Sequence, residues 1–219
     1  AIPDANALSD ALSHSGYKKI ALSGGRLAMQ DKSAVLDFGA SGKGIALDAV
    51  KAYLETRDIK NAVVSVGGST LLFGDKDFTV GIRNPEGNAG SYVAILNIPE
   101  GCVSTSGSYE RFFEQDGKQY HHIIDPETGY PAKSDHHILN PETGYPVDNG
   151  LVGVTIVSDS GLLSDALSTA CFVLGIEKGS ELASEYGCTA IFITEDKKIY
   201  IEGDADIVEI TDTSYTYGN

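Results

Sequence analysis

The sequence predicts an α+β fold, in which a mixed, largely antiparallel sheet is flanked by helices. Apolar residues recur at helical spacing near residues 4–15, 42–56, 162–174 and 178–186. Between residues 62 and 105, short β-type runs follow one another directly instead of alternating with helices. Consecutive strands favour antiparallel pairing, because parallel strands need a long crossover connection.

The first 37 residues are predicted to hold one helix and three short strands. Leu8 and Leu12 lie one helical turn apart within residues 4–15, which predicts a short amphipathic helix. Gly16 is expected to end it. The strands expected after this glycine are Lys19–Leu22, Arg26–Met29 and Ala34–Asp37.

The middle of the chain is predicted to begin with a helix over Gly42–Thr56 and to continue as a run of strands. The apolar stripe of this helix is supplied by Ile45, Leu47, Val50 and Leu54. Glycine, aspartate and proline pairs then punctuate the sequence, as expected of turns between short strands. The strands are expected at Ala62–Val66, Thr70–Phe73, Phe78–Ile82, Tyr92–Ile98 and Cys102–Thr105.

The remaining elements are predicted to be an apolar strand, two helices and a closing hairpin. Leu162–Leu174 is expected to be a buried helix that ends at Gly175, and Lys178–Tyr186 a second helix. A chain of 219 residues can bury one large core, so we expect a single domain over residues 1–219. The strands expected here are Leu151–Val157, Thr189–Ile193 and Lys198–Ile201.

The acidic composition limits the partners that the chain can have. The net charge of −15 argues against a nucleic acid or an anionic membrane as the main partner. The three cysteines, Cys102, Cys171 and Cys188, have no spacing typical of a zinc site or a disulfide framework. Cys171 and Cys188 lie in apolar segments and are expected to be small core residues.

Asp165 and Thr169 are the strongest candidates for metal ligands. On a helix they are i and i+4, so a carboxylate and a hydroxyl project from one face, and such oxygen donors suit Mg²⁺. A solvated aspartate and a threonine bonded to its own backbone would have the same spacing. The surrounding helix is apolar, however, and a buried carboxylate needs a partner of opposite charge. A cation is therefore the economical partner for this carboxylate, although the spacing alone favours the solvated pair.

The glycine-rich segment that precedes Lys43 is a candidate phosphate-binding loop. Its glycines expose backbone and its lysine carries one positive charge, although an ordinary exposed lysine at a helix start is the alternative. Gly67 and Gly68 follow an apolar strand, and they either end it or let a flat ligand ring approach the backbone. Together with Asp165, these features predict a metal-assisted site for a phosphate-containing ligand.

One internal repeat stands out. Residues 121–131 (HHIIDPETGYP) recur 15 positions later as residues 136–146 (HHILNPETGYP), with nine of eleven positions identical. Two copies at this period do not indicate a solenoid, so we interpret residues 121–150 as a local tandem duplication. Either His122 with Asp125 or His137 with Asn140 could serve a functional site. We favour the first copy because it keeps a carboxylate at Asp125. The loop could instead be an interaction surface between chains.

Four segments resemble the ApbE-type flavin transferases, a family that uses FAD to attach FMN covalently to other proteins. They occur in the family's order and span most of the chain, although the family is longer at its N-terminus and the chain is expected to lack that region. The matching segments are Asp37–Asp48 (DFGASGKGIALD), Val64–Gly68 (VSVGG), Ser104–Arg111 with His122–Pro131 (STSGSYER, HIIDPETGYP) and Ser164–Thr169 (SDALST).

The resemblance implies a role for individual residues. Asp165 and Thr169 match the family's Mg²⁺ ligands, and the backbone carbonyl that completes the set would be that of Gly42. His122 matches a histidine at the reactive centre, followed by Asp125. The residues expected to contact the flavin or its phosphates are Lys43, Gly67, Gly68, Thr105, Ser106, Gly107, Arg111 and His122.

The activity implied by the resemblance is Mg²⁺-dependent transfer of FMN from FAD to a threonine or serine of a partner protein, with release of AMP. The chain contains no acceptor motif of the family's kind, so the acceptor is expected to be a flavoprotein subunit modified in trans. FAD pyrophosphatase activity and non-catalytic FAD binding are the alternatives. The family resemblance also implies an extracytoplasmic, membrane-tethered lipoprotein. No oligomeric state is indicated.

Overall fold

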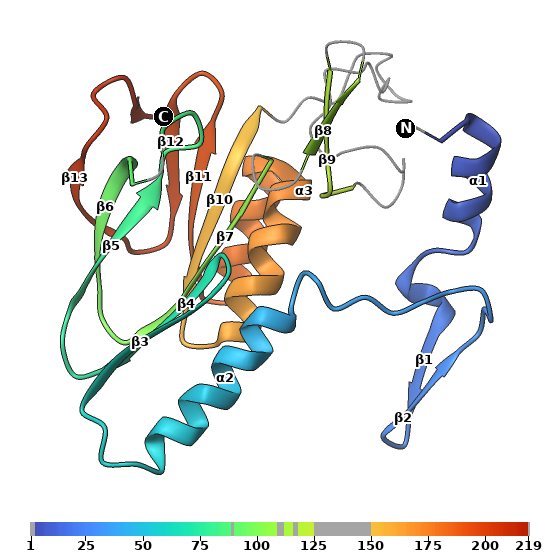
Figure 1. The fold of residues 1–219 in the computed structure, drawn as a ribbon, viewed down its shortest axis with the longest axis horizontal. Coiled ribbons are helices and arrows are strands. Elements are labelled where there is room, and N and C mark those ends of the chain that lie inside the picture. The colour runs from blue at the N-terminus through green and yellow to red at the C-terminus, as the bar shows by residue number, and fades with distance from the viewer. Residues whose placement is uncertain (1–2, 89, 109–111, 116–117, 125–149, 219) are drawn as a thin grey trace. The chain divides into compact units, whose positions relative to one another are not determined.

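The chain folds into two compact units in the computed structural model (Figure 1). The structure describes residues 3–88, 90–108, 112–115, 118–124 and 150–218. The first unit comprises residues 1–37 and 112–148, and the second comprises residues 38–111 and 149–219. In the first unit, helix α1 (Ala5–Ser13) begins at Asp4, whose side chain accepts hydrogen bonds from two backbone N–H groups.

The first unit also contains two antiparallel hairpins. Strands β1 (Ile20–Ser23) and β2 (Arg26–Met29) follow the short 3₁₀ helix η1 (Tyr17–Lys19), and β8 (Phe112–Gln115) pairs with β9 (Lys118–His121). The strand predicted at Ala34–Asp37 is wrong, because these residues have no regular structure.

The second unit has a seven-stranded sheet in the order β14-β12-β11-β10-β7-β4-β3 (Figure 1). Its neighbouring strands are antiparallel except β12 and β14, which are parallel. The strands are β3 (Asn61–Val66), β4 (Ser69–Gly74), β7 (Gly101–Gly107), β10 (Leu151–Ser158), β11 (Thr189–Thr194), β12 (Lys198–Glu202) and β14 (Thr216–Tyr217).

A smaller sheet packs against one face of the seven-stranded sheet. Its strands, β5 (Phe78–Arg83), β6 (Tyr92–Ile98) and β13 (Asp206–Ile210), pair in the antiparallel order β13-β6-β5. Side chains of both sheets, among them Leu72 and Leu96, share one buried cluster.

Helices α2 (Gly42–Glu55) and α3 (Gly161–Glu185) pack against the other face of the large sheet (Figure 1). Leu71 points into the cluster beneath α2, whereas its neighbour Leu72 points toward the small sheet, as strand alternation requires. Helix α3 is interrupted at Gly175, whose φ of 80° is not helical, so the predicted break between two helices is confirmed. None of the helices in the described ranges has the length and apolar content needed to span a membrane.

The predicted fold class, α+β with mainly antiparallel sheets, is confirmed. Strands β8, β9, β13 and β14 were not predicted, because their sequences are short and rich in polar residues. Whether the two units behave as one domain, as expected from chain length, stays a prediction.

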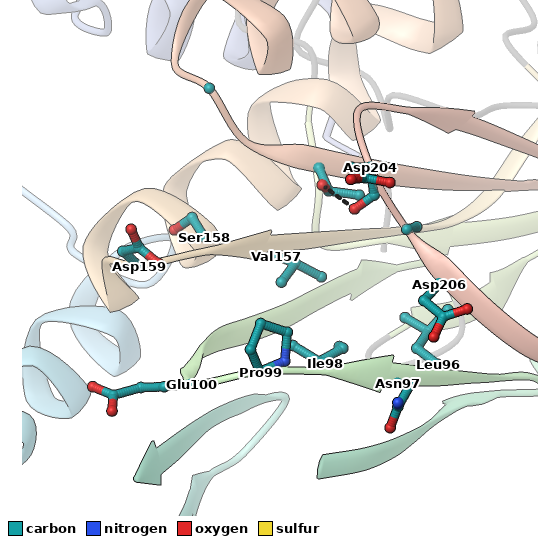
Figure 2. A pocket seen from close by; sticks show the side chains of 13 residues that line it. Leu96, Asn97, Ile98, Pro99, Glu100, Val157, Ser158, Asp159, Asp204 and Asp206 are labelled. Atoms are coloured by element: carbon teal, nitrogen blue, oxygen red, sulfur yellow. Dashed lines mark hydrogen bonds between the residues drawn. The ribbon is translucent and has the colours of Figure 1, made fainter. Parts of the chain in front are cut away.

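A cavity of about 230 Å³ lies in the second unit where β6 and β10 end (Figure 2). Leu96, Ile98 and Val157 form apolar parts of its lining. Four carboxylates also line it, from Glu100, Asp159, Asp204 and Asp206. Like charges repel, so this cavity does not suit a phosphate group.

Candidate functional site

The starts of helices α2 and α3 meet at two glycines. A Cβ added at Gly44 would overlap the carbonyl oxygen of Gly161, and one added at Gly161 would overlap that of Gly44. The two backbones therefore touch, which only residues without a side chain allow. This contact places the first turns of both helices against each other.

Asp48, a residue of α2, links the two helices by hydrogen bonds to the start of α3. Its carboxylate accepts hydrogen bonds from the backbone N–H groups of Gly161 (2.6 Å) and Leu162 (3.0 Å) and from the Ser160 hydroxyl (3.1 Å). The first N–H groups of a helix lack partners within the helix, so Asp48 acts as a cap supplied by another helix. The start of α3 is thus fixed relative to α2.

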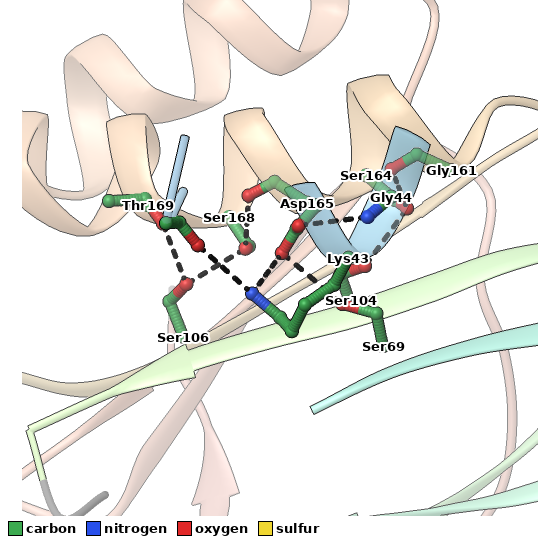
Figure 3. A network of polar contacts seen from close by, with 11 residues as sticks. Lys43, Gly44, Ser69, Ser104, Ser106, Gly161, Ser164, Asp165, Ser168 and Thr169 are labelled. Carbon is green, nitrogen blue, oxygen red and sulfur yellow. Dashed lines mark hydrogen bonds and ion pairs between the residues drawn. The ribbon is translucent and has the colours of Figure 1, made fainter. Parts of the chain in front are cut away.

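Asp165 lies one turn farther along α3, and its side chain is only 2% exposed. Its Oδ2 accepts a hydrogen bond from the backbone N–H of Gly44 at 2.9 Å, and its Oδ1 accepts one from the Ser69 hydroxyl at 3.2 Å (Figure 3). The ammonium of Lys43 lies 2.7 Å from Oδ1. The opposite charge that a buried carboxylate requires is therefore supplied by the protein itself.

A row of hydroxyl groups joins β7 to α3 beside this carboxylate (Figure 3). The Ser106 hydroxyl lies 2.8 Å from that of Ser168 and 3.0 Å from that of Thr169. The hydroxyls of Ser104 and Ser164 lie 3.0 Å apart. This row gives the neighbourhood of Asp165 a set of neutral oxygen atoms.

The serines of this network were not singled out by sequence reasoning, apart from Ser106. The sequence does contain a pattern that indicates such a network. Ser104 and Ser106 are two residues apart on a strand, and Ser164 and Ser168 are four apart on a helix, so each pair lies on one face. Their pairing across β7 and α3 depends on tertiary packing. Ser69, Ser104, Ser164 and Ser168 are all fully buried.

A second cavity, of about 630 Å³, lies on the opposite face of β4 and β7, toward the small sheet. Gly67, Gly68 and Thr105 line it together with Arg83, and the Thr105 hydroxyl lies 2.8 Å from that of Thr155. Such a volume lies within the range of small-molecule pockets. Alternation along β7 therefore separates the predicted flavin contacts, because Thr105 faces the cavity and Ser106 faces α3.

Gly67 lies in the turn between β3 and β4, where it is close both to Lys43 and to the second cavity. Its φ of +59° lies in the left-handed region, and a Cβ added there would lie 3.2 Å from Cδ of Lys43. The aliphatic stem of Lys43 thus runs beside the Gly67 turn, which borders the cavity. Gly107 ends β7 and pairs with Gly153 of β10.

The remaining predicted site residues are Arg111 and those of the repeated loop. His122 is exposed and belongs to the first unit, whereas Asp165 belongs to the second. Arg111, Asp125, His137 and Asn140 lie outside the described residues. Their roles, and the choice between the two copies of the loop, stay predictions.

The donors around Asp165 fit a hard cation such as Mg²⁺. The oxygen ligands available are the Asp165 carboxylate and the hydroxyls of Thr169 and Ser106. The carbonyl oxygen of Gly39 lies 3.4 Å from the Lys43 ammonium. Within the described residues, no group of three or more His, Cys, Asp or Glu side chains could hold a metal. Mg²⁺ needs no such group, because it is often bound by one or two carboxylates and keeps several water ligands.

Comparisons with known proteins identify relatives along most of the chain. A sequence profile of the ApbE family matches residues 1–136 and 132–192. The matches overlap, and each contains one copy of the repeated loop. An FAD:protein FMN transferase of Treponema pallidum is 34% identical over 236 residues, covering 98% of this chain and 61% of its own length. One of Klebsiella pneumoniae is 36% identical over 174 residues, covering 79% and 50%.

Solved structures of ApbE proteins have a similar fold to this chain. The ApbE protein of Thermotoga maritima superposes with a TM-score of 0.75 at 29% identity, covering 95% of this chain and 63% of that protein. The apo form of the flavinyl transferase ApbE of Pseudomonas stutzeri gives a TM-score of 0.69 at 28% identity, covering 100% and 63%. The chain therefore spans between half and two thirds of the length of these relatives.

Proposed function

This chain belongs to the ApbE family, and on that premise we propose that it transfers FMN from FAD to a hydroxyl group of a partner protein. The substrates are FAD and a flavoprotein subunit that carries the acceptor threonine or serine. The observation that carries the proposal is the buried carboxylate of Asp165, which accepts hydrogen bonds from the Gly44 backbone N–H and the Ser69 hydroxyl at the junction of α2 and α3. Relatives named FAD:protein FMN transferase cover most of the chain.

In the proposed reaction, the acceptor hydroxyl oxygen forms a bond to the FMN phosphorus. The bond between that phosphorus and the bridging oxygen breaks, and AMP leaves with this oxygen. The proton of the hydroxyl passes to a base, for which His122 is the candidate because histidine is the commonest general base in enzymes. Asp125 would orient this base. Both assignments rest on the family resemblance.

We assign the cation to Asp165, Thr169 and the backbone carbonyl of Gly42. A bound Mg²⁺ supplies neutralisation of the charge that develops on the diphosphate. The Ser106 hydroxyl holds Thr169 in place, and Ser69 and Gly44 orient the Asp165 carboxylate. Lys43 and Arg111 are the candidate cationic contacts of the phosphates, and Gly67 and Gly68 leave backbone accessible to the flavin. Thr105, Ser106 and Gly107 complete the proposed flavin-binding set.

The test incubates the chain with FAD and Mg²⁺, with and without an acceptor protein, and follows AMP release and acceptor mass. We expect a mass gain of one FMN per acceptor, with equal AMP, and loss of both in Asp165→Ala. Asp58→Ala is the matched control, because the Asp58 side chain is 94% exposed.

Other outcomes select the alternatives. AMP release without acceptor modification would identify an FAD pyrophosphatase, in which water replaces the acceptor hydroxyl. Bound FAD that survives incubation with Mg²⁺ and acceptor would identify a non-catalytic flavin-binding protein. The extracytoplasmic, membrane-tethered location implied by the family stays a prediction.

A further inference from the structure

Lys43 neutralises Asp165, the carboxylate to which we assign the metal cation. Its Nζ lies 2.7 Å from the carboxylate Oδ1 and 3.4 Å from the carbonyl oxygen of Gly39. An ammonium and a divalent cation both require oxygen ligands and both neutralise a carboxylate. They compete for one carboxylate oxygen, because their like charges repel each other.

The carboxylate is the fixed member of this ion pair. It belongs to a buried helix turn, and both of its oxygens are held by other donors, Gly44 N–H and the Ser69 hydroxyl. The Lys43 side chain is 35% exposed, and its contact with the carbonyl oxygen of Gly39 is long, at 3.4 Å. A lysine on four flexible methylene groups can therefore leave while Asp165 stays in place.

The stem of Lys43 lies close to the border of the larger cavity. Its Cδ lies beside the Gly67 turn, and Gly67 and Gly68 both line that cavity. To reach the border of the cavity, the ammonium would leave Asp165 and pass the Gly67 turn. A positive charge there would attract a phosphate group.

We propose that Lys43 is a displaceable internal counter-ion, which a divalent cation expels from Asp165 so that its ammonium becomes a contact for the flavin diphosphate. This inference rests on the proposed function, since it assigns the cation to Asp165. Lys43 then lowers the affinity of the empty site for cations. It also couples the two ligands, because the diphosphate gains its lysine contact only after the cation has bound.

Isothermal titration calorimetry with MgCl₂ alone tests the first part. Lys43→Met keeps the aliphatic stem and removes the charge, so we expect at least tenfold tighter Mg²⁺ binding than in the wild type. Lys43→Arg keeps a competing charge and should show no gain. Lys51→Met is the matched control on the same helix, because Lys51 pairs with Glu100 at 3.2 Å instead of with the site.

Titration with ADP, a diphosphate without flavin, tests the coupling. At saturating Mg²⁺, Lys43→Met should bind ADP about tenfold more weakly than the wild type. Without Mg²⁺ the two proteins should bind ADP alike, because the wild-type ammonium is then held by Asp165. A loss of ADP affinity that is equal with and without Mg²⁺ would contradict the proposed coupling.

The outcomes separate this inference from the proposed function. If the wild type binds Mg²⁺ and Lys43→Met binds it no more tightly, Lys43 is not a competitor and the inference alone fails. If neither protein binds Mg²⁺, the cation site assigned to Asp165 fails as well. Should Lys43→Met fold poorly without a cation, its melting temperature is measured across a Mg²⁺ series. The inference then requires a larger Mg²⁺-induced rise in melting temperature than in the wild type.

Discussion

Gly44 and Gly161 lie in direct backbone contact where helices α2 and α3 begin, and no side chain fits between them. The backbone N–H of the same Gly44 donates to the Asp165 carboxylate at 2.9 Å. One residue therefore sets both the approach of the helices and the position of the carboxylate. The geometry of the candidate site depends on this helix crossing.

Gly44→Ala should destabilise the protein by about 1–3 kcal/mol, the usual range for an overpacked core. The added methyl group would overlap the Gly161 carbonyl, so the helices must move apart and the Gly44 hydrogen bond to Asp165 must lengthen. Urea unfolding measures the loss. Gly42→Ala is the control, because the nearest atom to its new Cβ would be 3.9 Å away. Equal stability of the two variants would show that the helix contact is looser than described.

Asp48→Asn should cost about 1–2 kcal/mol, as expected for a helix cap that carries a charge. The carboxylate accepts three hydrogen bonds from the first residues of α3, and an amide has only one oxygen with which to accept them. Chemical unfolding of the variant measures this cost. Asp58→Asn removes an exposed carboxylate 3.5 Å from Lys60 and should change stability by less than about 0.5 kcal/mol. A similar effect in both variants would argue against the cap.

The three cysteines should resist alkylation in the folded protein. Burial raises the pKa of Cys102 and of Cys171 to about 11, and it also raises the pKa of Cys188. At pH 8 a thiol with a pKa near 11 is ionised in only about one molecule in 1,000, and the thiolate is the reactive form. Iodoacetamide treatment followed by mass spectrometry should show almost no adduct before unfolding and three after it. Rapid labelling of the folded protein would contradict the buried positions.

The Asp31 carboxyl should titrate below its ordinary range. A hydrogen bond from His14, 2.7 Å away, and a second from the Ser33 backbone hold the pKa of Asp31 down. Because the folded pKa is lower than the unfolded value of about 3.9, the carboxylate contributes stability above that value. This contribution is lost as the pH falls through the folded pKa.

Carbon-13 NMR titration of the Asp31 carboxyl measures this shift directly. Replacing His14 by alanine removes the main cause, so the midpoint should rise toward the ordinary value. An unchanged midpoint in His14→Ala would show that the hydrogen bond to the Ser33 backbone is sufficient.

Local sequence patterns identified most elements of the second unit. The spacing of apolar residues predicted α2 within one residue at its C-terminal end, and β6 was predicted with the bounds that the structure has. Gly175 predicted the interruption of α3, since a glycine readily takes the positive φ found there. These features depend on neighbouring residues, which is why sequence alone determined them.

The site was predicted in its residue types but not in its contacts. The sequence indicated that Asp165 is buried and needs a positive partner, and it placed Lys43 in a separate phosphate-binding role. The structure joins the two residues, 122 positions apart, because the Gly44–Gly161 contact brings their helices together. The cap from Asp48 and the serine pairs between β7 and α3 also cross long stretches of chain. Composition and periodicity thus determined the elements and the chemical character of the site, whereas tertiary packing decided which groups neutralise and orient one another.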